Sequence, residues 1–196
     1  MRNIAIFASG NGTNAENIIV FFASHPNIRV SLIVSNKPDA FVLKRAENYH
    51  LPTLVIHREI FYNSNYLIVD PLAIVLKKYS IDFIVLAGFM WLIPVYMIDN
   101  FPNKIINIHP ALLPKYGGKG MYGNKVHSAV IDNGETESGI TIHYVNRHYD
   151  QGKIIFQAKC KVSAGDTPET LAEKVHRLEY QHYPVVIEQL VSKHCQ

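Results

Sequence analysis

The stretch Ile4-Ala5-Ile6-Phe7-Ala8-Ser9-Gly10-Asn11-Gly12-Thr13-Asn14 decides the fold of this chain. It begins as a short apolar run and enters a turn that contains two glycines. Beyond the turn, residues 15–23 carry apolar side chains at helical spacing. A buried strand, a glycine turn and a helix in this order open a doubly wound α/β sheet, so we expect that fold class.

The same alternation of apolar runs and helical patterns continues through the first half of the chain. The run at 83–87 is the most hydrophobic and that at 105–108 is similar, as expected for parallel strands that are buried on both faces. The pattern predicts a mostly parallel sheet over residues 1–110. Its further strands are predicted at 30–35, 53–56, 83–87 and 105–108, and its further helices at 40–49 and 70–79.

The second half of the chain has a different pattern. Residues 112–124 hold four glycines and predict a loop, and a helix over 125–133 follows. Residues 139–145 and 153–162 are predicted to be partner strands on either side of a turn. We therefore expect an antiparallel extension of the sheet in the C-terminal half.

A last helix is predicted from its start signal, with Thr167 as N-cap and Pro168 in the first turn. Thr170 stands at the capping-box position in place of the usual Glu. The 196 residues contain no linker or repeat, so one domain over residues 1–196 is expected, with halves at 1–110 and 111–196.

Composition argues against several classes of binding partner and indicates the cellular compartment. The formal net charge is only +3 and the basic residues are scattered, which argues against a nucleic-acid groove. No long apolar run predicts a membrane span, and the apolar run at the N-terminus is too short for a signal peptide. The cysteines, Cys160 and Cys195, lack C-x-x-C spacing, which argues against structural zinc or a disulfide framework and predicts a reducing, cytoplasmic compartment.

The glycine turn has three interpretations. Gly10-x-Gly12-x-x-Ala15 loosely fits a dinucleotide fingerprint, but Ser35-Asn36-Lys37 follows the second strand where a ribose-binding acid is expected. Alternatively, backbone N–H groups of Gly12, Thr13 and Asn14 hold a phosphate at the start of the helix. A tight turn without a ligand is the third interpretation.

Asn107-Ile108-His109-Pro110-Ala111 closes a predicted strand. Side chains alternate along a strand, so Asn107 and His109 share a face while Ile108 turns into the core. Pro110 has no N–H to donate and ends the regular pairing. An amide can polarise an oxygen and an imidazole can stabilise or move a proton, so this pair suits transfer of a carbonyl-level carbon to a nucleophile.

Four motifs together resemble a known family. Ser9–Asn14, Leu86–Met90, Asn107–Pro114 and Asp150–Gly152 stand in the order seen in folate-dependent formyltransferases. The likeness spans nearly the whole chain. The Gly-Asn-Gly-Thr-Asn loop and the length favour the glycinamide ribonucleotide (GAR) formyltransferases over methionyl-tRNA formyltransferase and formyltetrahydrofolate hydrolase.

This resemblance implies a Rossmann-like formyltransferase fold and a reaction. A formyl group would pass from 10-formyltetrahydrofolate to the amine of GAR, giving formylglycinamide ribonucleotide and tetrahydrofolate in de novo purine biosynthesis, without metal or nicotinamide. The implied catalytic residues are Asn107, His109 and Asp150. Asp150 is expected to favour the protonated form of His109, because a nearby carboxylate raises the pKa of a histidine.

The resemblance also implies binding residues. Gly12, Thr13, Asn14 and Glu179 match positions that bind the GAR phosphate and ribose, which makes 1–110 the phosphate-binding half and 111–196 the folate-side half. The donor would contact Arg58 through its glutamate tail and the segment Met90, Trp91, Leu92 and Ile93 through its pterin. Asn107 is also expected to contact the donor. From the residues alone, Arg58 could equally be a surface charge, Met90 and Trp91 core packing, and His143 structural.

The chain departs from the family pattern at four places. They are an apparent insertion over 61–68, Trp91, the loop Lys119–Gly123 and His176.

Three rival functions stay open: a nicotinamide-dependent oxidoreductase, a non-catalytic sensor of a phosphorylated metabolite, and a folate formyl hydrolase. The sequence leaves the oligomeric state open between a monomer and a weak homodimer.

Overall fold

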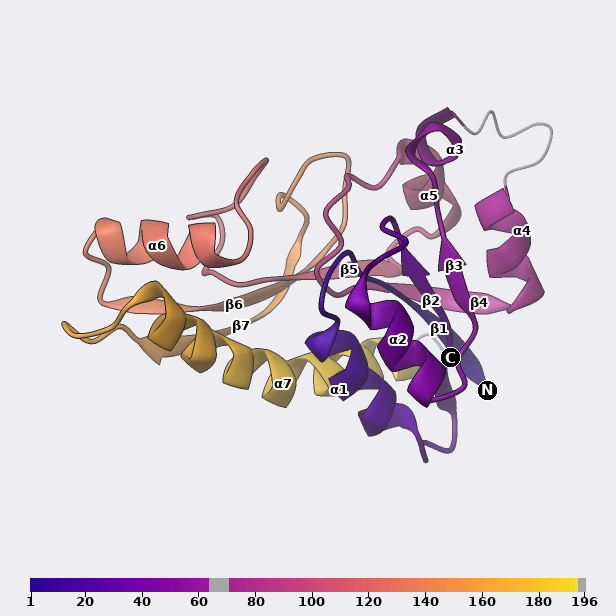
Figure 1. The fold of residues 1–196 in the computed structure, drawn as a ribbon, viewed down its shortest axis with the longest axis horizontal. Coiled ribbons are helices and arrows are strands. Elements are labelled where there is room, and N and C mark those ends of the chain that lie inside the picture. The colour runs from indigo at the N-terminus through magenta and orange to yellow at the C-terminus, as the bar shows by residue number, and fades with distance from the viewer. Residues whose placement is uncertain (64–70, 194–196) are drawn as a thin grey trace.

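The computed structural model describes residues 1–63 and 71–193. Its centre is one seven-stranded sheet in the order β3-β2-β1-β4-β5-β6-β7 (Figure 1). The strands are β1 (Arg2–Phe7), β2 (Ile28–Ser35), β3 (Thr53–Val55), β4 (Ile81–Leu86), β5 (Ile105–His109), β6 (Glu137–Tyr144) and β7 (Ile154–Lys161). The strands from β3 to β5 pair in parallel, and β6 and β7 extend the sheet antiparallel, which confirms the predicted fold class.

Helices cover both faces of the sheet. They are α1 (Thr13–Phe22), α2 (Phe41–Asn48), α3 (Arg58–Asn63), α4 (Pro71–Lys78), α5 (Val95–Asn100), α6 (Asn124–Asp132) and α7 (Pro168–Lys193). Figure 1 shows α6 beside the antiparallel strands at one end of the long axis, and α3 and α4 at the other end.

Strand β1 shows why the apolar runs of the sequence are continuous. Ile4 and Ile6 belong to the core that packs against α1, α2 and α7, whereas Ala5 and Phe7 belong to the core that packs against α3, α4 and α5. All four side chains are fully buried. A strand with helices on both faces needs apolar residues at every position, so its sequence shows no alternation.

Helices α3 and α5 are absent from the sequence predictions. Each has six residues, which is too short for a helical apolar period to stand out. The predicted helix 70–79 corresponds to α4, and its first residue, Asp70, lies outside the described residues, as does most of the apparent insertion at 61–68. The loop predicted over 112–124 contains no strand or helix before α6 begins.

The start of α7 confirms the predicted cap. The Thr170 N–H donates to the Thr167 hydroxyl at 3.3 Å, and the Thr167 N–H donates to the Thr170 hydroxyl at 2.9 Å. The Thr170 hydroxyl therefore does what a Glu side chain does in a capping box.

Helix α7 also contains Pro184, which cannot donate to the carbonyl of Tyr180 four residues earlier. The Asn17 amide on α1 donates to that carbonyl at 3.0 Å, so the gap in the hydrogen bonding of α7 becomes a contact between two helices.

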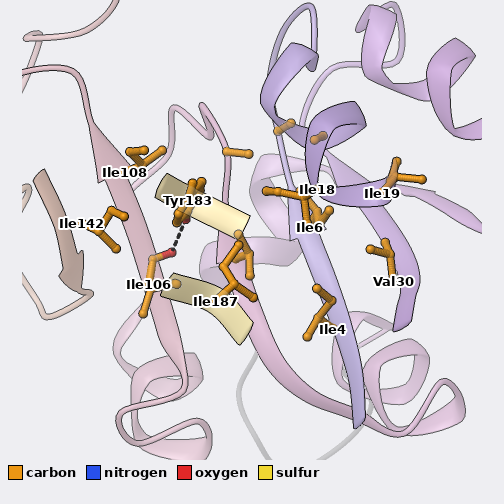
Figure 2. Packing of buried hydrophobic residues seen from close by; sticks show 14 of the residues in the cluster. Ile4, Ile6, Ile18, Ile19, Val30, Ile106, Ile108, Ile142, Tyr183 and Ile187 are labelled. Atoms are coloured by element: carbon orange, nitrogen blue, oxygen red, sulfur yellow. Dashed lines mark hydrogen bonds between the residues drawn. The ribbon is translucent and has the colours of Figure 1, made fainter. Parts of the chain in front are cut away.

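Tyr183 joins α7 to the middle of the sheet. The side chain is fully buried, and its hydroxyl donates to the carbonyls of Leu86 on β4 at 2.9 Å and of Ile106 on β5 at 3.5 Å. Figure 2 shows it among the isoleucines of the core, with the bond to Ile106 dashed. The strand end that carries Asn107 is therefore supported from beneath by α7.

Candidate active site

Strand β5 positions the amide and imidazole predicted from the sequence. It pairs with β4 on one side and with β6 on the other, where Asn107 stands opposite His143 and His109 opposite Thr141. Ile108 belongs to the hydrophobic core, as its alternate position requires. The His109 side chain is also almost fully buried, at 4 % exposure.

Asp150 reaches the same place from the loop between β6 and β7. Its Oδ1 accepts from Asn107 Nδ2 at 3.4 Å, and its Oδ2 lies 3.5 Å from His109 Nδ1. The Gly118 N–H donates to Oδ2 at 2.9 Å. The structure thus brings together the three residues that the resemblance assigns to catalysis, although Asp150 lies more than forty positions from the other two in the sequence.

Two glycines allow these loops to approach one another. A Cβ on Gly152 would lie 1.5 Å from the carbonyl oxygen of Tyr144. A Cβ on Gly117 would lie 2.5 Å from Leu113 and 3.2 Å from the Cβ of Asp150. A larger residue at 117 would push the 112–124 loop away from Asp150 and disturb the contact between Gly118 and Asp150, whereas a larger residue at 152 would force the two ends of the β6–β7 connection apart.

His143 belongs to the same cluster of side chains. The sequence interpretation treated it as a structural or substrate-lining residue. Its Nδ1 lies 2.9 Å from the Tyr144 carbonyl, which can only accept, so Nδ1 carries the proton. Nε2 then accepts from Asn107 Nδ2 at 3.2 Å and lies 3.6 Å from Asp150 Oδ1. The cross-strand pairing of β5 with β6 is the signal that places His143 beside Asn107.

The 112–124 loop holds the other side of His109. Its Nε2 lies 2.7 Å from the carbonyl oxygen of Tyr116, so Nε2–H is the donor. The loop itself is fixed by the buried Thr141 hydroxyl, which donates to the Ala111 carbonyl at 2.7 Å and accepts from the Leu113 N–H at 3.0 Å. The path of this loop therefore sets the orientation of the imidazole.

Burial and charge act in opposite directions on the two titrating groups. Burial lowers the pKa of His109 below its usual value; Asp150 and the Tyr116 carbonyl raise it without compensating fully. Asp150 therefore acts in the expected direction, but the expected net rise of the histidine pKa is wrong because desolvation is larger. Burial raises the pKa of Asp150, yet His143, His109 and the Gly118 N–H together hold it below the usual range. At neutral pH the carboxylate is ionised.

A cavity of about 370 Å³ opens next to Asp150. Its lining comes from the loop after His109 and from the loop that carries Asp150. The lining residues are Leu113, Pro114, Gly117, Gly118, Tyr149, Asp150, Gln151, Gly152 and Ile154. The Asp150 carboxylate therefore faces a space large enough for a small organic group.

The glycine turn lies on the other side of the site, at the start of α1. Gly12 has φ 76°, and a Cβ there would lie 2.5 Å from Val42 on α2, so close packing and backbone conformation both require glycine. The Asn14 amide donates to Glu179 Oε2 on α7 at 2.8 Å, and the Asn14 amide oxygen is buried without a partner among the described residues. Burial raises the pKa of Glu179, and the Asn14 hydrogen bond and His176 oppose that rise.

The residues assigned to the donor lie along the segment after β4. The Met90 N–H donates to the Ser9 hydroxyl at 2.9 Å, and the Met90 side chain is exposed. Trp91 is partly buried and contacts Arg58, so these two predicted residues are together. The Ile93 side chain is buried in the core, and only its backbone is left for a ligand.

Comparison with known proteins gives a consistent result. The sequence pattern of the formyl transferase family matches residues 2–187. The chain is 43% identical to the chloroplastic phosphoribosylglycinamide formyltransferase of Arabidopsis thaliana over 187 residues, which is 95% of this chain and 64% of that protein. It therefore spans less than two thirds of the length of that relative.

Two bacterial proteins match over nearly their full length. The chain is 35% identical to the phosphoribosylglycinamide formyltransferase of Bacillus subtilis, covering 98% of this chain and 96% of the relative. The crystal structure of glycinamide ribonucleotide transformylase 1 from Symbiobacterium toebii superposes with a TM-score of 0.87 at 32% identity, covering 98% of this chain and 89% of that one. The chain belongs to the formyl transferase family.

Proposed function

We propose that this protein transfers the formyl group of 10-formyltetrahydrofolate to the amine of GAR, giving formylglycinamide ribonucleotide and tetrahydrofolate in de novo purine biosynthesis. One observation carries the proposal: the ionised carboxylate of Asp150 lies within 3.5 Å of both the Asn107 amide and the His109 imidazole, beside a cavity. The names of the relatives support the same substrates.

The amide serves the first step. The neutral amine of GAR attacks the formyl carbon, a C–N bond forms, and the carbonyl electron pair moves to oxygen. One Asn107 N–H is held by His143 at 3.2 Å, while its bond to Asp150 is longer, at 3.4 Å. The weaker bond leaves that N–H available to the oxyanion, and such a donor stabilises negative charge that develops in the transition state.

The Asp150 carboxylate transfers the proton. The attacking nitrogen becomes positively charged and must lose a proton before the bond from carbon to the folate nitrogen breaks. Asp150 is ionised and faces the cavity, so it accepts this proton and returns it, directly or through water, to the departing N10 of tetrahydrofolate. The balance is one proton moved from the amine to N10.

A hydrogen bond connects His109, at the reaction centre, to the 112–124 loop. Its Nε2–H is engaged by the Tyr116 carbonyl, so the formyl oxygen receives this donor only when Tyr116 moves away. We infer that substrate binding rearranges this loop and frees the imidazole. A glycine-rich loop next to a strand end is suited to such a movement.

The two substrates enter from opposite sides in this proposal. Gly12, Thr13 and Asn14 bind the GAR phosphate at the positive end of α1, and Glu179 contacts its ribose. The donor lies along Met90–Ile93 with its tail toward Arg58. The cytoplasmic location is kept as a prediction, and residues 1–63 and 71–193 contain no helix long and apolar enough to cross a membrane.

The test is a spectrophotometric assay of 10-formyltetrahydrofolate deformylation with and without GAR. Deformylation that requires GAR supports the proposal. Deformylation at the same rate without GAR indicates a hydrolase, in which water replaces the amine. No deformylation under either condition rejects both functions, and a binding screen with nucleotides and phosphorylated metabolites then separates the two remaining alternatives.

A further inference from the structure

An aromatic cluster runs from the core to the surface beside the donor segment. The ring centroids of Phe7 and Phe89 are 5.4 Å apart, and those of Phe89 and Phe61 are 5.9 Å apart. Phe61 lies 5.5 Å from Trp91, which lies 6.0 Å from Tyr62. Tyr62 is the exposed end of the cluster, so the core supports a rigid aromatic surface at this edge.

Arg58 lies on this surface. Its guanidinium carbon is 5.3 Å from the centroid of the Tyr62 ring and 5.9 Å from that of Trp91. Arg58 and Tyr62 are four residues apart on α3, so they share a face of that helix. No carboxylate lies within 4.0 Å of Arg58 in residues 1–63 and 71–193. The cation is therefore oriented by rings and its N–H groups are available to an anion.

Tyr62 also connects Arg58 to the site. Its hydroxyl donates to the Leu92 carbonyl, in the donor segment, at 3.1 Å. Burial raises the pKa of Tyr62, and so does the Tyr149 hydroxyl, whereas Arg58 lowers it. Tyr149 also lines the cavity next to Asp150.

We propose that Tyr62 is a positioning residue for the formyl donor. Its ring and that of Trp91 hold the Arg58 guanidinium where it pairs with a carboxylate of the donor tail, and its hydroxyl fixes α3 to Leu92. This inference rests on the proposed function, because the donor named there ends in a benzoyl-glutamate. The rings replace an acidic neighbour as the group that orients the arginine, so no carboxylate of the described residues competes with the ligand.

The main test compares two donors in Tyr62→Leu: 10-formyltetrahydrofolate and the corresponding 10-formyl pteroate, which lacks the glutamate. We expect KM for the first donor to rise about two- to fivefold with kcat unchanged, since an exposed cation–π contact is worth about 0.5–1 kcal/mol. KM for the second donor stays the same. Tyr62→Phe keeps the ring and retains most of the wild-type KM.

Two controls separate positioning from a general effect. Tyr79→Leu removes the partly buried ring of another cation–π pair, with Lys78, and leaves both KM values unchanged. Arg58→Gln abolishes the preference for the glutamate-bearing donor, and adding Tyr62→Leu to it has little further effect. Three results would each overturn the proposal. They are equal increases in KM for both donors, additive effects in the double variant, and a Tyr62→Phe variant that is as impaired as Tyr62→Leu.

A binding measurement keeps this proposal separate from the catalytic one. Trp91 is the only tryptophan of the chain, so its fluorescence reports this surface directly. We expect N-(4-aminobenzoyl)-glutamate to quench it in the wild type and at about two- to fivefold higher concentration in Tyr62→Leu. If quenching differs in this way but the protein transfers no formyl group to GAR, the proposed function is rejected and the positioning role is supported. Equal quenching in both proteins would reject the positioning role.

Discussion

At the scale of single residues, Asp150 is the group on which the proposed chemistry depends most. Its carboxylate touches Asn107, His109 and the Gly118 N–H, and the pKa is held low. Asp150→Asn is nearly isosteric but cannot accept the proton from the amine. We expect kcat to fall about 10²- to 10⁴-fold with donor KM nearly unchanged, as for loss of a general base. Steady-state kinetics measure both, and an unchanged kcat would contradict the role.

His127 gives a prediction for pH. It is buried on α6, its Nδ1 has no partner among the described residues, and burial, with His176 and His109, lowers its pKa to about 4. Because the folded-state pKa lies below the unfolded one, the unfolded chain binds more protons between about pH 6.5 and pH 4, and stability falls as the pH falls through this range.

The variant His127→Gln tests this linkage. We expect the wild type to lose about 1–2 kcal/mol more stability than the variant between pH 7 and pH 5, since one pKa unit corresponds to about 1.4 kcal/mol. Urea unfolding at the two pH values measures the difference. His50→Gln, at an exposed position, is the matched control. If the unfolding free energy of the variant falls between pH 7 and pH 5 as much as that of the wild type, His127 is not the source of this pH dependence.

At the scale of elements, the glycine turn between β1 and α1 is required by packing as well as by any ligand. Gly12→Ala would place a methyl 2.5 Å from Val42 at a φ of 76°. We expect a loss of about 2–4 kcal/mol in unfolding free energy, from left-handed backbone strain and overpacking. Gly10→Ala, where nothing lies within 4 Å, is the control and should unfold like the wild type in urea. Equal stability of both variants would contradict this account.

The same elements show what the sequence could predict. Apolar runs identified the parallel strands β1, β2, β4 and β5, because burial on both faces leaves a signal in nearly every residue. The antiparallel strands β6 and β7 were predicted as partners on either side of a turn. The short helices α3 and α5 left no such signal, and with α3 the sequence interpretation missed Tyr62. The Asn107 and His109 pair followed from alternation along one strand, whereas the place of His143 depends on the register of β6 against β5, which is a tertiary property.

At the scale of the whole molecule, α7 joins both halves. It packs on α1 through the Asn17 contact to Tyr180 and on β4 and β5 through Tyr183, and one core cluster includes residues from Ile4 to Val191. We therefore expect a single cooperative unfolding transition. Trp91 fluorescence, from the first half, and far-UV circular dichroism, from the whole chain, should give the same urea midpoint. Separate midpoints would show that the halves unfold independently.

The most direct measurement follows the formyl carbon itself. The protein is incubated with GAR and 10-formyltetrahydrofolate that carries ¹³C in its formyl group, and ¹³C NMR identifies the product. The account predicts that the label appears as a formamide on the glycinamide nitrogen, with little free formate. A label that appears as formate, or stays on the folate in the presence of GAR, would contradict it.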